Sequence, residues 1–453
     1  MPKLNVLFIL IDGMRSDQFF GSMKTSKTPN IDSLIKKGAY FTQAISSVDG
    51  TILSLNSIFT GHFPFQTGIR AKKLLLKENN FLEIFKKNGY HICGLVPNLT
   101  SFLPLIEYFE NNENTFYEGP PPESLGTSLT KKVVNFLESE KSRTPWFYYL
   151  HLFDLHPLRE GKSSQGIENF NNEIFGSSPY ERTVSSIDFW LGKIFQHIDF
   201  SNTITIITAD HGERIPYENI RTIDFEPKLA STVKFGKKVF PKSTHQLGGK
   251  FLSKIRNTIV KARTKKASKN LTNYQKRSRD PYFTLSLFDE LIHIPLLFVG
   301  DSINSRIINQ PVRHIDIFPT ICELIDIKYQ IKTTHGRSLV PMIQGKEMDE
   351  EPIYLHTMPY QQISPADLIG IRTNNYKYFR SAGNKTENVN LYDLIHDPYE
   401  NNNIAHTSIH LVEQFEHILT QIQKDSLSDH KEEEISEQEM KRIENELKRL
   451  GYI

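Results

Sequence analysis

Cysteine is almost absent from this chain of 453 residues, which contains only Cys93 and Cys322. Two distant cysteines form neither a disulfide framework nor a thiolate metal site, and their scarcity is typical of a reducing compartment. Long apolar runs are also missing near the start. The first apolar run, residues 6–11, is too short to span a bilayer, and it begins so early that we expect no secretory leader before it. We therefore expect a cytoplasmic protein without a membrane span.

Acidic side chains are absent from residues 234–279, which contain fifteen lysines and arginines. Subtracting these fifteen from the formal net charge of +2 leaves −13 for the rest of the chain. This stretch lies in a basic insertion, residues 214–280. Its part from 250 to 279 has an apolar helical face bordered by basic residues, which is typical of a helix on an anionic membrane surface or of a lid helix. Nucleic acid binding is not expected, since few aromatic residues are interleaved for base stacking.

Three apolar segments each end in an aspartate. Residues 5–12, 146–154 and 203–210 are rich in Ile, Leu, Thr and aromatic residues and end in Asp12, Asp154 and Asp210. Because the carboxyl ends of parallel strands meet at one edge of a sheet, we expect the three carboxylates to converge. Clustered carboxylates repel one another, so the pattern predicts a bound divalent metal at this edge.

A hydroxyl group follows a turn in the segment before the second predicted helix. Asp49 and Gly50 form a turn-like pair, Thr51 comes next, and the apolar residues from 52 to 59 have helical spacing. A hydroxyl at a helix N-terminus meets the positive end of the helix dipole, which suits an alkoxide or a bound oxyanion. The alternative interpretation is that Thr51 serves only as a helix N-cap.

Strands and helices alternate along most of the chain. With 38% hydrophobic and 11% aromatic residues, the sequence can form a large core. We predict an α/β fold with a mainly parallel sheet, helices on both of its faces and a small C-terminal antiparallel α+β subdomain. The predicted units are a catalytic domain over residues 1–345, the subdomain over 346–425 and a charged helix over 426–453.

Ordered motifs along nearly the full length resemble the sulfatase branch of the alkaline phosphatase superfamily. They include ILIDGMRSD at 9–17, TPNIDSLIKKGAYF at 28–41, SLNSIFTGHFPFQTGI at 54–69, ITADHGE at 207–213, LFDELIHIPLLF at 287–298, HIDIFPTICELI at 314–325, HGRSLVPMIQG at 335–345 and NLYDLIHDPYENNNIA at 390–405. The resemblance implies the corresponding fold and an enzyme that acts on an anionic ester, either a phosphate or a sulfate.

The resemblance also assigns roles to particular residues. It implies that Asp12, Asp210 and His211 bind a metal and that Thr51 is the nucleophile and a further ligand. His156 matches the histidine beside the bound anion or leaving group, and Arg15 matches an arginine that follows the first metal-binding aspartate. A second metal site would use Asp154 and His156 with His245. His151, His314 and Asp316 are interpreted as structural residues.

The departures from the sulfatase pattern favour a different chemistry. Sulfatases form formylglycine from Cys or Ser, followed by Pro or Ala and then Arg, whereas this chain has Thr51, Leu53 and Leu55. The second aspartate of a calcium site is replaced by Gly13. An unmodified threonine resembles the phosphodiesterase and phosphotransferase relatives, whose reaction passes through a covalent phospho-threonine.

The remaining choices concern the metal and the reaction. Mixed nitrogen and oxygen ligands favour one or two Zn²⁺ or Mn²⁺ ions, with Ca²⁺ and Mg²⁺ as alternatives. The first alternative function is a sulfuric ester hydrolase without formylglycine. The second is a catalytically weak protein that binds anionic lipid or glycan through its basic insertion and is peripheral to the membrane.

Overall fold

The computed structural model describes residues 3–67, 74–76, 80–111, 114–118, 123–140, 143–160, 162–215, 268–279, 286–329, 335–358 and 364–424, with isolated positions at 258, 262, 265, 266 and 441. His245, most of the basic insertion and most of the predicted helix over residues 426–453 lie outside the described residues. The predictions made for them stay predictions.

In the described part of the chain, nine strands form one large sheet with the order β4-β3-β5-β1-β6-β7-β2-β8, and β9 pairs with β2. The strands are β1 (Asn5–Ile11), β2 (Ala39–Ile45), β3 (His91–Pro97), β4 (Phe116–Tyr117), β5 (Trp146–Leu152), β6 (Thr203–Thr208), β7 (His293–Val299), β8 (Arg306–Ile308) and β9 (Val312–Arg313). Only β7 runs antiparallel to its neighbours β6 and β2. The predicted mainly parallel sheet is confirmed, and β1, β5 and β6 are adjacent at its centre.

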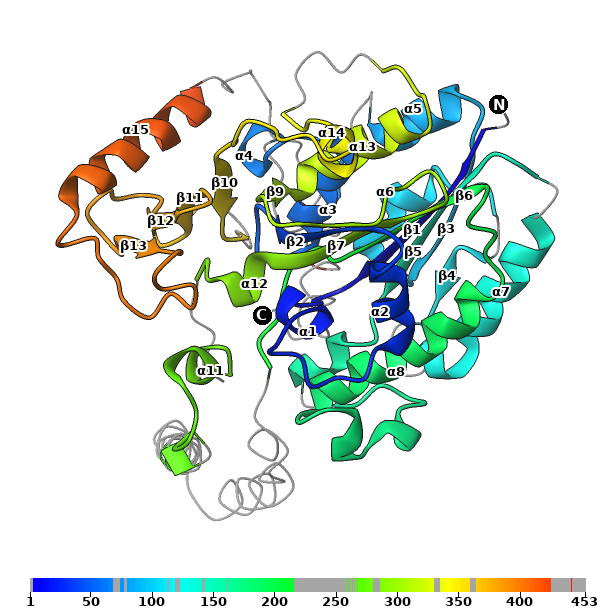
Figure 1. Ribbon diagram of the computed structural model, residues 1–453, viewed down its shortest axis with the longest axis horizontal. Helices are drawn as coiled ribbons and strands as arrows, with labels where there is room; N and C mark the ends of the chain where they lie inside the picture. The colour runs from blue at the N-terminus through cyan, green and yellow to red at the C-terminus, as the bar shows by residue number, and fades with distance from the viewer. Residues whose placement is uncertain are drawn as a thin grey trace.

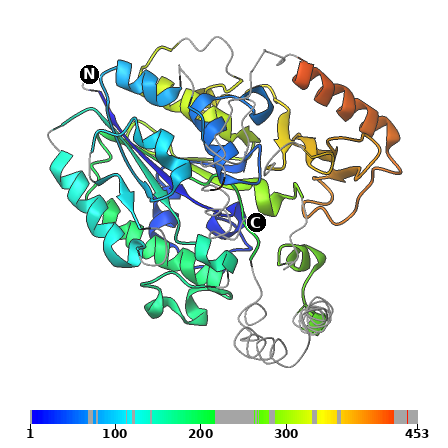
Figure 2. The same ribbon diagram turned by 180° about the vertical axis from the view of Figure 1, so that it is seen from behind.

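Helices cover both faces of this sheet (Figures 1 and 2). In Figure 1, α3 (Thr51–Thr60), α5 (Phe81–Lys87), α13 (Ile317–Leu324) and α14 (Val340–Ile343) lie above the sheet, and α1 (Ser16–Phe19), α2 (Pro29–Ile35), α7 (Thr130–Ser139) and α8 (Pro179–Phe195) lie below it. Alternating side chains of the strands serve the two layers. Phe8 stacks on Phe318 of α13 with ring centroids 5.5 Å apart, and Tyr148 stacks on Phe136 of α7 at 3.8 Å.

Four further strands form the predicted C-terminal antiparallel sheet. They are β10 (Ile353–His356), β11 (Leu368–Arg372), β12 (Tyr376–Ser381) and β13 (Asn390–Asp393), each paired with the next. The helix α15 (Ile409–Lys424) covers this sheet and buries Phe415 and Leu419 in a cluster with Tyr378. The short helices α4 (Pro64–Thr67), α6 (Leu103–Ile106), α11 (Asn273–Arg277) and α12 (Asp289–Ile292) complete the described helices. None of the described helices has the length and apolar character needed to cross a membrane.

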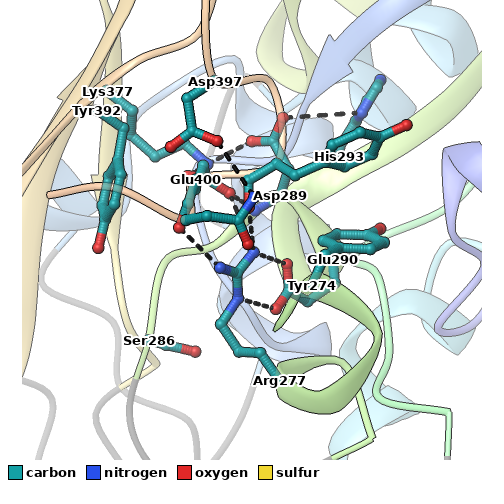
Figure 3. A network of polar contacts seen from close by, with 12 residues as sticks. Tyr274, Arg277, Ser286, Asp289, Glu290, His293, Lys377, Tyr392, Asp397 and Glu400 are labelled. Atoms are coloured by element: carbon teal, nitrogen blue, oxygen red, sulfur yellow. Dashed lines mark hydrogen bonds and ion pairs between the residues drawn. The ribbon is translucent and has the colours of Figure 1, made fainter. Parts of the chain in front are cut away.

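A buried network of charges joins α11 and α12 to the second sheet (Figure 3). Lys377 of β12 and Glu400 are both fully buried and form an ion pair of 2.6 Å, and Lys377 also pairs with Asp289 of α12. Arg277 of α11 pairs with Glu290 at 2.6 Å and donates to the carbonyl oxygen of Glu400 at 2.8 Å. Arg277 belongs to the stretch predicted to face a membrane, yet its guanidinium binds carboxylates inside the molecule. Arg277 therefore does not support the predicted membrane-binding surface.

The two ends of the insertion meet at its base. The amide of Ile215 donates to the carbonyl oxygen of Ser278, which directly follows α11, at 2.9 Å. Tyr274 of α11 in turn donates to a carboxylate oxygen of Asp17 at 2.8 Å. The described end of the insertion is thereby attached to α1, which contains Asp17.

Candidate active site

The candidate site forms where β1 and β6 end, because these neighbouring parallel strands deliver Asp12 and Asp210 to the same edge. Asp12 directly follows β1, and Asp210 follows β6 after one intervening residue. One oxygen of Asp210, Oδ1, accepts hydrogen bonds from the amides of His211 at 2.9 Å and Gly13 at 3.2 Å. Gly13 has φ +67, a left-handed conformation that suits glycine. The backbone therefore orients Asp210 and leaves its second oxygen, Oδ2, turned elsewhere.

Thr51 lies at the first position of α3, and its hydroxyl faces the strand ends. Its Oγ1 is 3.1 Å from Oδ1 of Asp12 and 3.2 Å from Nε2 of His211. The N-cap of α3 is Gly50, so Thr51 is not the capping residue that the alternative interpretation required. The first-turn amides of a helix carry partial positive charge, which stabilises negative charge on an oxygen at this place.

Two histidines complete the surroundings of Thr51. The Nδ1 atom of His211 is 2.6 Å from the carbonyl oxygen of Gly212, which can only accept, so Nδ1 carries the proton. In the neutral ring, Nε2 of His211 then presents a lone pair toward Thr51 and the carboxylates. His156 lies on the other side of Asp12, with its Nδ1 at 2.9 Å from Oδ2. Its ring stacks on Phe153 with centroids 4.6 Å apart.

Burial and neighbouring charges shift the pKa values of Asp12 and Asp210 in opposite directions. Burial raises the pKa of Asp210 to about 6, which His211 partly opposes. Burial also acts to raise the pKa of Asp12, but the hydrogen bond and charge of His156 outweigh it and hold that pKa well below its usual range. Asp12 is thus the charged member of the pair, and Asp210 resists ionisation in the absence of a cation.

The chemistry of this cluster fits a divalent cation. Ligand atoms of Asp12, His151 and Asp210 all lie within 4.8 Å of one another, and all three residues are buried. Oδ2 of Asp210 and Nε2 of His151 are buried without a hydrogen-bond partner among the described residues. Such atoms are costly unless something binds them, and two carboxylates with imidazole nitrogens are typical ligands of Zn²⁺ or Mn²⁺. Nε2 of His211, predicted as a ligand beside Asp12 and Asp210, lies 3.6 Å from Oδ1 of Asp12 and 3.5 Å from Oδ2 of Asp210.

Other predicted site residues have different surroundings. Arg15 is buried and forms a two-point ion pair with Asp17, with Nε to Oδ1 at 2.9 Å and Nη2 to Oδ2 at 2.6 Å. It also donates to the hydroxyl of Tyr274 at 2.5 Å. Asp154 accepts a hydrogen bond from the amide of Leu125 at 3.0 Å and is not a member of the group around Asp12.

The strand register explains the position of Asp154. His151 is level with Leu10 in the parallel pair of β5 and β1, so Asp12 corresponds to residue 153 of the neighbouring strand. Asp154 lies one residue beyond that level, and successive side chains of a strand point to opposite faces. The expected convergence of three carboxylates is therefore seen for Asp12 and Asp210, and Asp154 lies apart from them.

Three residues near the site were given no catalytic or metal-binding role from the sequence. His151 joins the carboxylate group. Arg159 pairs with Glu213, the residue two positions after His211. Asp49 lies in the turn before Thr51, where burial raises its pKa to about 6. The sequence offered one signal for His151. It lies an even number of residues before the position of its strand that is level with Asp12, and residues at even spacing on a strand share a face.

The loop that leads into Thr51 is supported by His314. Its ring is fully buried, and Nδ1 accepts a hydrogen bond from the amide of Ser47 at 2.8 Å. Burial lowers the pKa of His314 to about 3, so the ring stays neutral in the folded protein across the physiological range. The predicted structural role of His314 agrees with these contacts.

Replacing His314 by asparagine is expected to weaken the dependence of stability on acid pH. The pKa of His314 is about 3 in the fold and about 6.5 when unfolded, so its contribution is complete above pH 6.5 and falls by about 2 kcal/mol at pH 5. Urea unfolding at pH 7 and pH 5 should show a drop that is smaller in His314→Asn by this amount. His396→Asn, at an exposed histidine, serves as the control. An identical drop in wild type and His314→Asn would contradict the assignment.

Solved structures with this fold include enzymes of two ester chemistries. A phosphonate monoester hydrolase of Agrobacterium radiobacter superposes with a TM-score of 0.63 at 15% identity, covering 94% of this chain and 96% of that one. A 2-O GAG sulfatase superposes with a TM-score of 0.63 at 16% identity, covering 94% and 93%. These likenesses show that the chain shares the fold of both enzymes.

The family follows from the sequence models. The Sulfatase model matches residues 4–327, and the model described as N-sulphoglucosamine sulphohydrolase, C-terminal, matches residues 282–429. The chain belongs to the sulfatase family. Arylsulfatase K of Mus musculus is 22% identical over an alignment of 385 residues, which covers 82% of this chain but only 61% of that protein. An ulvan-active sulfatase of Formosa agariphila is 22% identical over 460 residues, covering 89% and 77%.

Proposed function

We propose that this protein is a metal-dependent phosphoester hydrolase or phosphotransferase in which Thr51 is the nucleophile. The observation that carries the proposal is the position of the Thr51 hydroxyl, between Asp12 Oδ1 at 3.1 Å and His211 Nε2 at 3.2 Å at the N-terminus of α3. A threonine hydroxyl needs activation to react at neutral pH. A carboxylate, an imidazole lone pair and a helix N-terminus are assembled around it for that purpose.

The proposed reaction has two displacements. The Thr51 oxygen attacks phosphorus while its proton leaves toward the adjacent basic groups, and the bond from phosphorus to the leaving oxygen breaks. His156, held by Asp12, donates a proton to that leaving oxygen. Water or an acceptor alcohol then attacks the phospho-threonine and frees Thr51. A divalent cation bound by Asp12, Asp210 and His211 would lower the pKa of the hydroxyl and neutralise developing charge.

A sulfuric ester hydrolase is the second candidate. It is favoured by the names of arylsulfatase K and the ulvan-active sulfatase, both similar to this chain over most of its length. The phosphonate monoester hydrolase with the same fold favours phosphorus chemistry equally. In this second candidate, an unmodified Thr51 would attack sulfur, because threonine is not the residue from which formylglycine is made.

Parallel assays of three nitrophenyl esters test the choice. Turnover of the phosphate monoester, the phosphate diester and the sulfate is measured with Zn²⁺ or Mn²⁺ supplied, and with a chelator as control. Preference for a phosphate ester, lost on chelation, is the expected result. Preference for the sulfate would support the second candidate, and absence of metal-dependent turnover of all three would contradict both.

A further inference from the structure

His151 lies on the central strand face from which the site is built. The register places it level with Leu10 of β1, and Leu10 is level with Thr208 of β6. Side chains alternate along strands, so His151 shares a face with Asp12 and Asp210, which lie two residues farther along their strands. The ligand atoms of these three residues fall within 4.8 Å of one another.

The contacts of His151 satisfy one ring nitrogen and leave the other without a hydrogen bond. Nδ1 is 2.6 Å from the hydroxyl of Tyr149, whereas Nε2 is buried with no hydrogen-bond partner in the described part of the chain. The ring packs between Phe102 and Phe153, with centroids at 4.9 and 5.1 Å, and these apolar rings offer Nε2 no partner. Oδ2 of Asp210 is also buried without a hydrogen-bond partner among the described residues, and Nε2 of His211 lies 3.5 Å from it.

We propose that His151 is an additional ligand of the metal centre, so that a divalent cation binds between Asp12, His151 and Asp210. A cation at this point accepts a lone pair from Nε2 of His151 and satisfies Oδ2 of Asp210 at once. It also compensates the repulsion between two buried carboxylates. With the lone pair of Nε2 on the cation, Nδ1 carries the proton and donates it to the hydroxyl oxygen of Tyr149. This hydrogen bond orients the ring, as partners of metal-bound histidines generally do.

This inference deepens the proposed function, because it concerns the same metal centre. It also changes which residue the middle strand supplies. The sequence predicted Asp154, which is bound to the Leu125 amide, and His245 as further ligands. In the inferred centre, β5 contributes His151, so the three central strands β5, β1 and β6 each provide a ligand.

The decisive experiment measures metal affinity rather than turnover. Zn²⁺ binding to the full chain is determined by competition with a chelating dye, and metal content by elemental analysis after gel filtration. His151→Phe keeps an aromatic ring between Phe102 and Phe153 but removes both nitrogens. We expect its Zn²⁺ affinity to fall by at least about 10- to 100-fold, the loss seen when even an outer partner of a metal ligand is removed.

Tyr149→Phe is the matched control, because it removes the hydrogen bond to Nδ1 and leaves Nε2 in place. Its affinity should fall less than that of His151→Phe. Melting temperatures without metal separate the two roles of the histidine: a structural residue alters the metal-free value, whereas a ligand alters the increase that Zn²⁺ produces. Wild-type affinity in folded His151→Phe would overturn the inference.

A measurement on the wild-type protein covers the case in which His151→Phe does not fold. Crystals soaked in Zn²⁺ should show an anomalous peak about 2.0–2.1 Å from Nε2 of His151. A peak near His211 with none in contact with His151 would also overturn the inference. Metal binding through His151 without ester turnover would contradict the proposed function alone, so the two hypotheses fail in distinguishable ways.

Discussion

Replacing Thr51 by alanine is expected to lower ester turnover by roughly 10⁴-fold or more, the loss typical of removing a catalytic nucleophile. Thr51 is buried to 4% exposure at the start of α3, and alanine is a good helix former, so the fold should persist. The residual groups, Asp12 and His211, can still orient a water molecule, but no covalent intermediate can form. The measurement is steady-state turnover of the best nitrophenyl ester, with circular dichroism to confirm folding.

Two further variants make this result specific. Ser57→Ala removes another buried hydroxyl of α3, one that has no hydrogen-bond partner among the described residues, and should keep nearly full activity. Thr51→Ser restores a hydroxyl and should recover part of the rate. Rapid acid quenching of the wild type should give a phosphorylated peptide containing Thr51. Full activity in Thr51→Ala, or a phosphorylated residue elsewhere, would show that a different group is the nucleophile.

Replacing Lys377 by methionine is expected to destabilise the protein by about 3–5 kcal/mol, the usual cost of removing one partner of a buried ion pair. The Lys377 side chain is fully buried and pairs with Glu400 at 2.6 Å and with Asp289. Methionine fills a similar volume but removes the nearest cation of Glu400, which keeps only Arg277 at 3.8 Å, while Asp289 keeps Arg372 at 3.2 Å. Burial already raises the pKa of Glu400 to about 7, so this carboxyl group is sensitive to losing its positive neighbour.

The matched control is Lys385→Met, which removes an exposed lysine that lies 3.4 Å from Glu416. An exposed pair of this kind contributes less than about 1 kcal/mol. Urea unfolding of both variants at pH 7 gives the comparison, and at pH 5 the Lys377→Met protein should recover stability as Glu400 takes up a proton. Equal stability of the two variants would show that the buried network contributes little.

The central fold was predictable because its strands carry strong local signals. The apolar runs of β1, β5 and β6 are continuous, as expected for strands buried on both faces, and each is followed by polar chemistry. The rule that active residues follow the carboxyl ends of parallel strands then brought Asp12, Asp210 and His211 together with Thr51. Their common location depends on the adjacency of β1 and β6, two strands that lie far apart in the sequence.

The sequence did not identify His151 as a member of the site, because a shift of one position along a strand changes the face on which a side chain lies. Asp154 and His151 lie three residues apart in the same segment, and only the register with β1 decides which of them faces Asp12. Register depends on packing of the whole sheet, so it is not encoded in the local sequence. A histidine inside an apolar strand is usually a buried structural residue, so nothing in the sequence placed His151 beside the carboxylates.

Ion pairs between residues far apart in the sequence could not be predicted from the sequence either. Arg277 lies in the basic stretch, and its partner Glu290 is 13 residues away, while Glu400 is 123 residues away. The composition correctly showed an excess of positive charge in this stretch, but a count of charges does not show which partner each side chain binds. The network in Figure 3 shows that part of a basic segment can bind internal acids.

The hydrogen bond between Ile215 and Ser278 has a consequence for how this chain can vary. Because these two residues meet at 2.9 Å, the segment between them is a closed loop whose ends are fixed by the fold. A change in the length of the chain between these two points therefore leaves the paired ends in place, and the strands of the large sheet need not move to accommodate it.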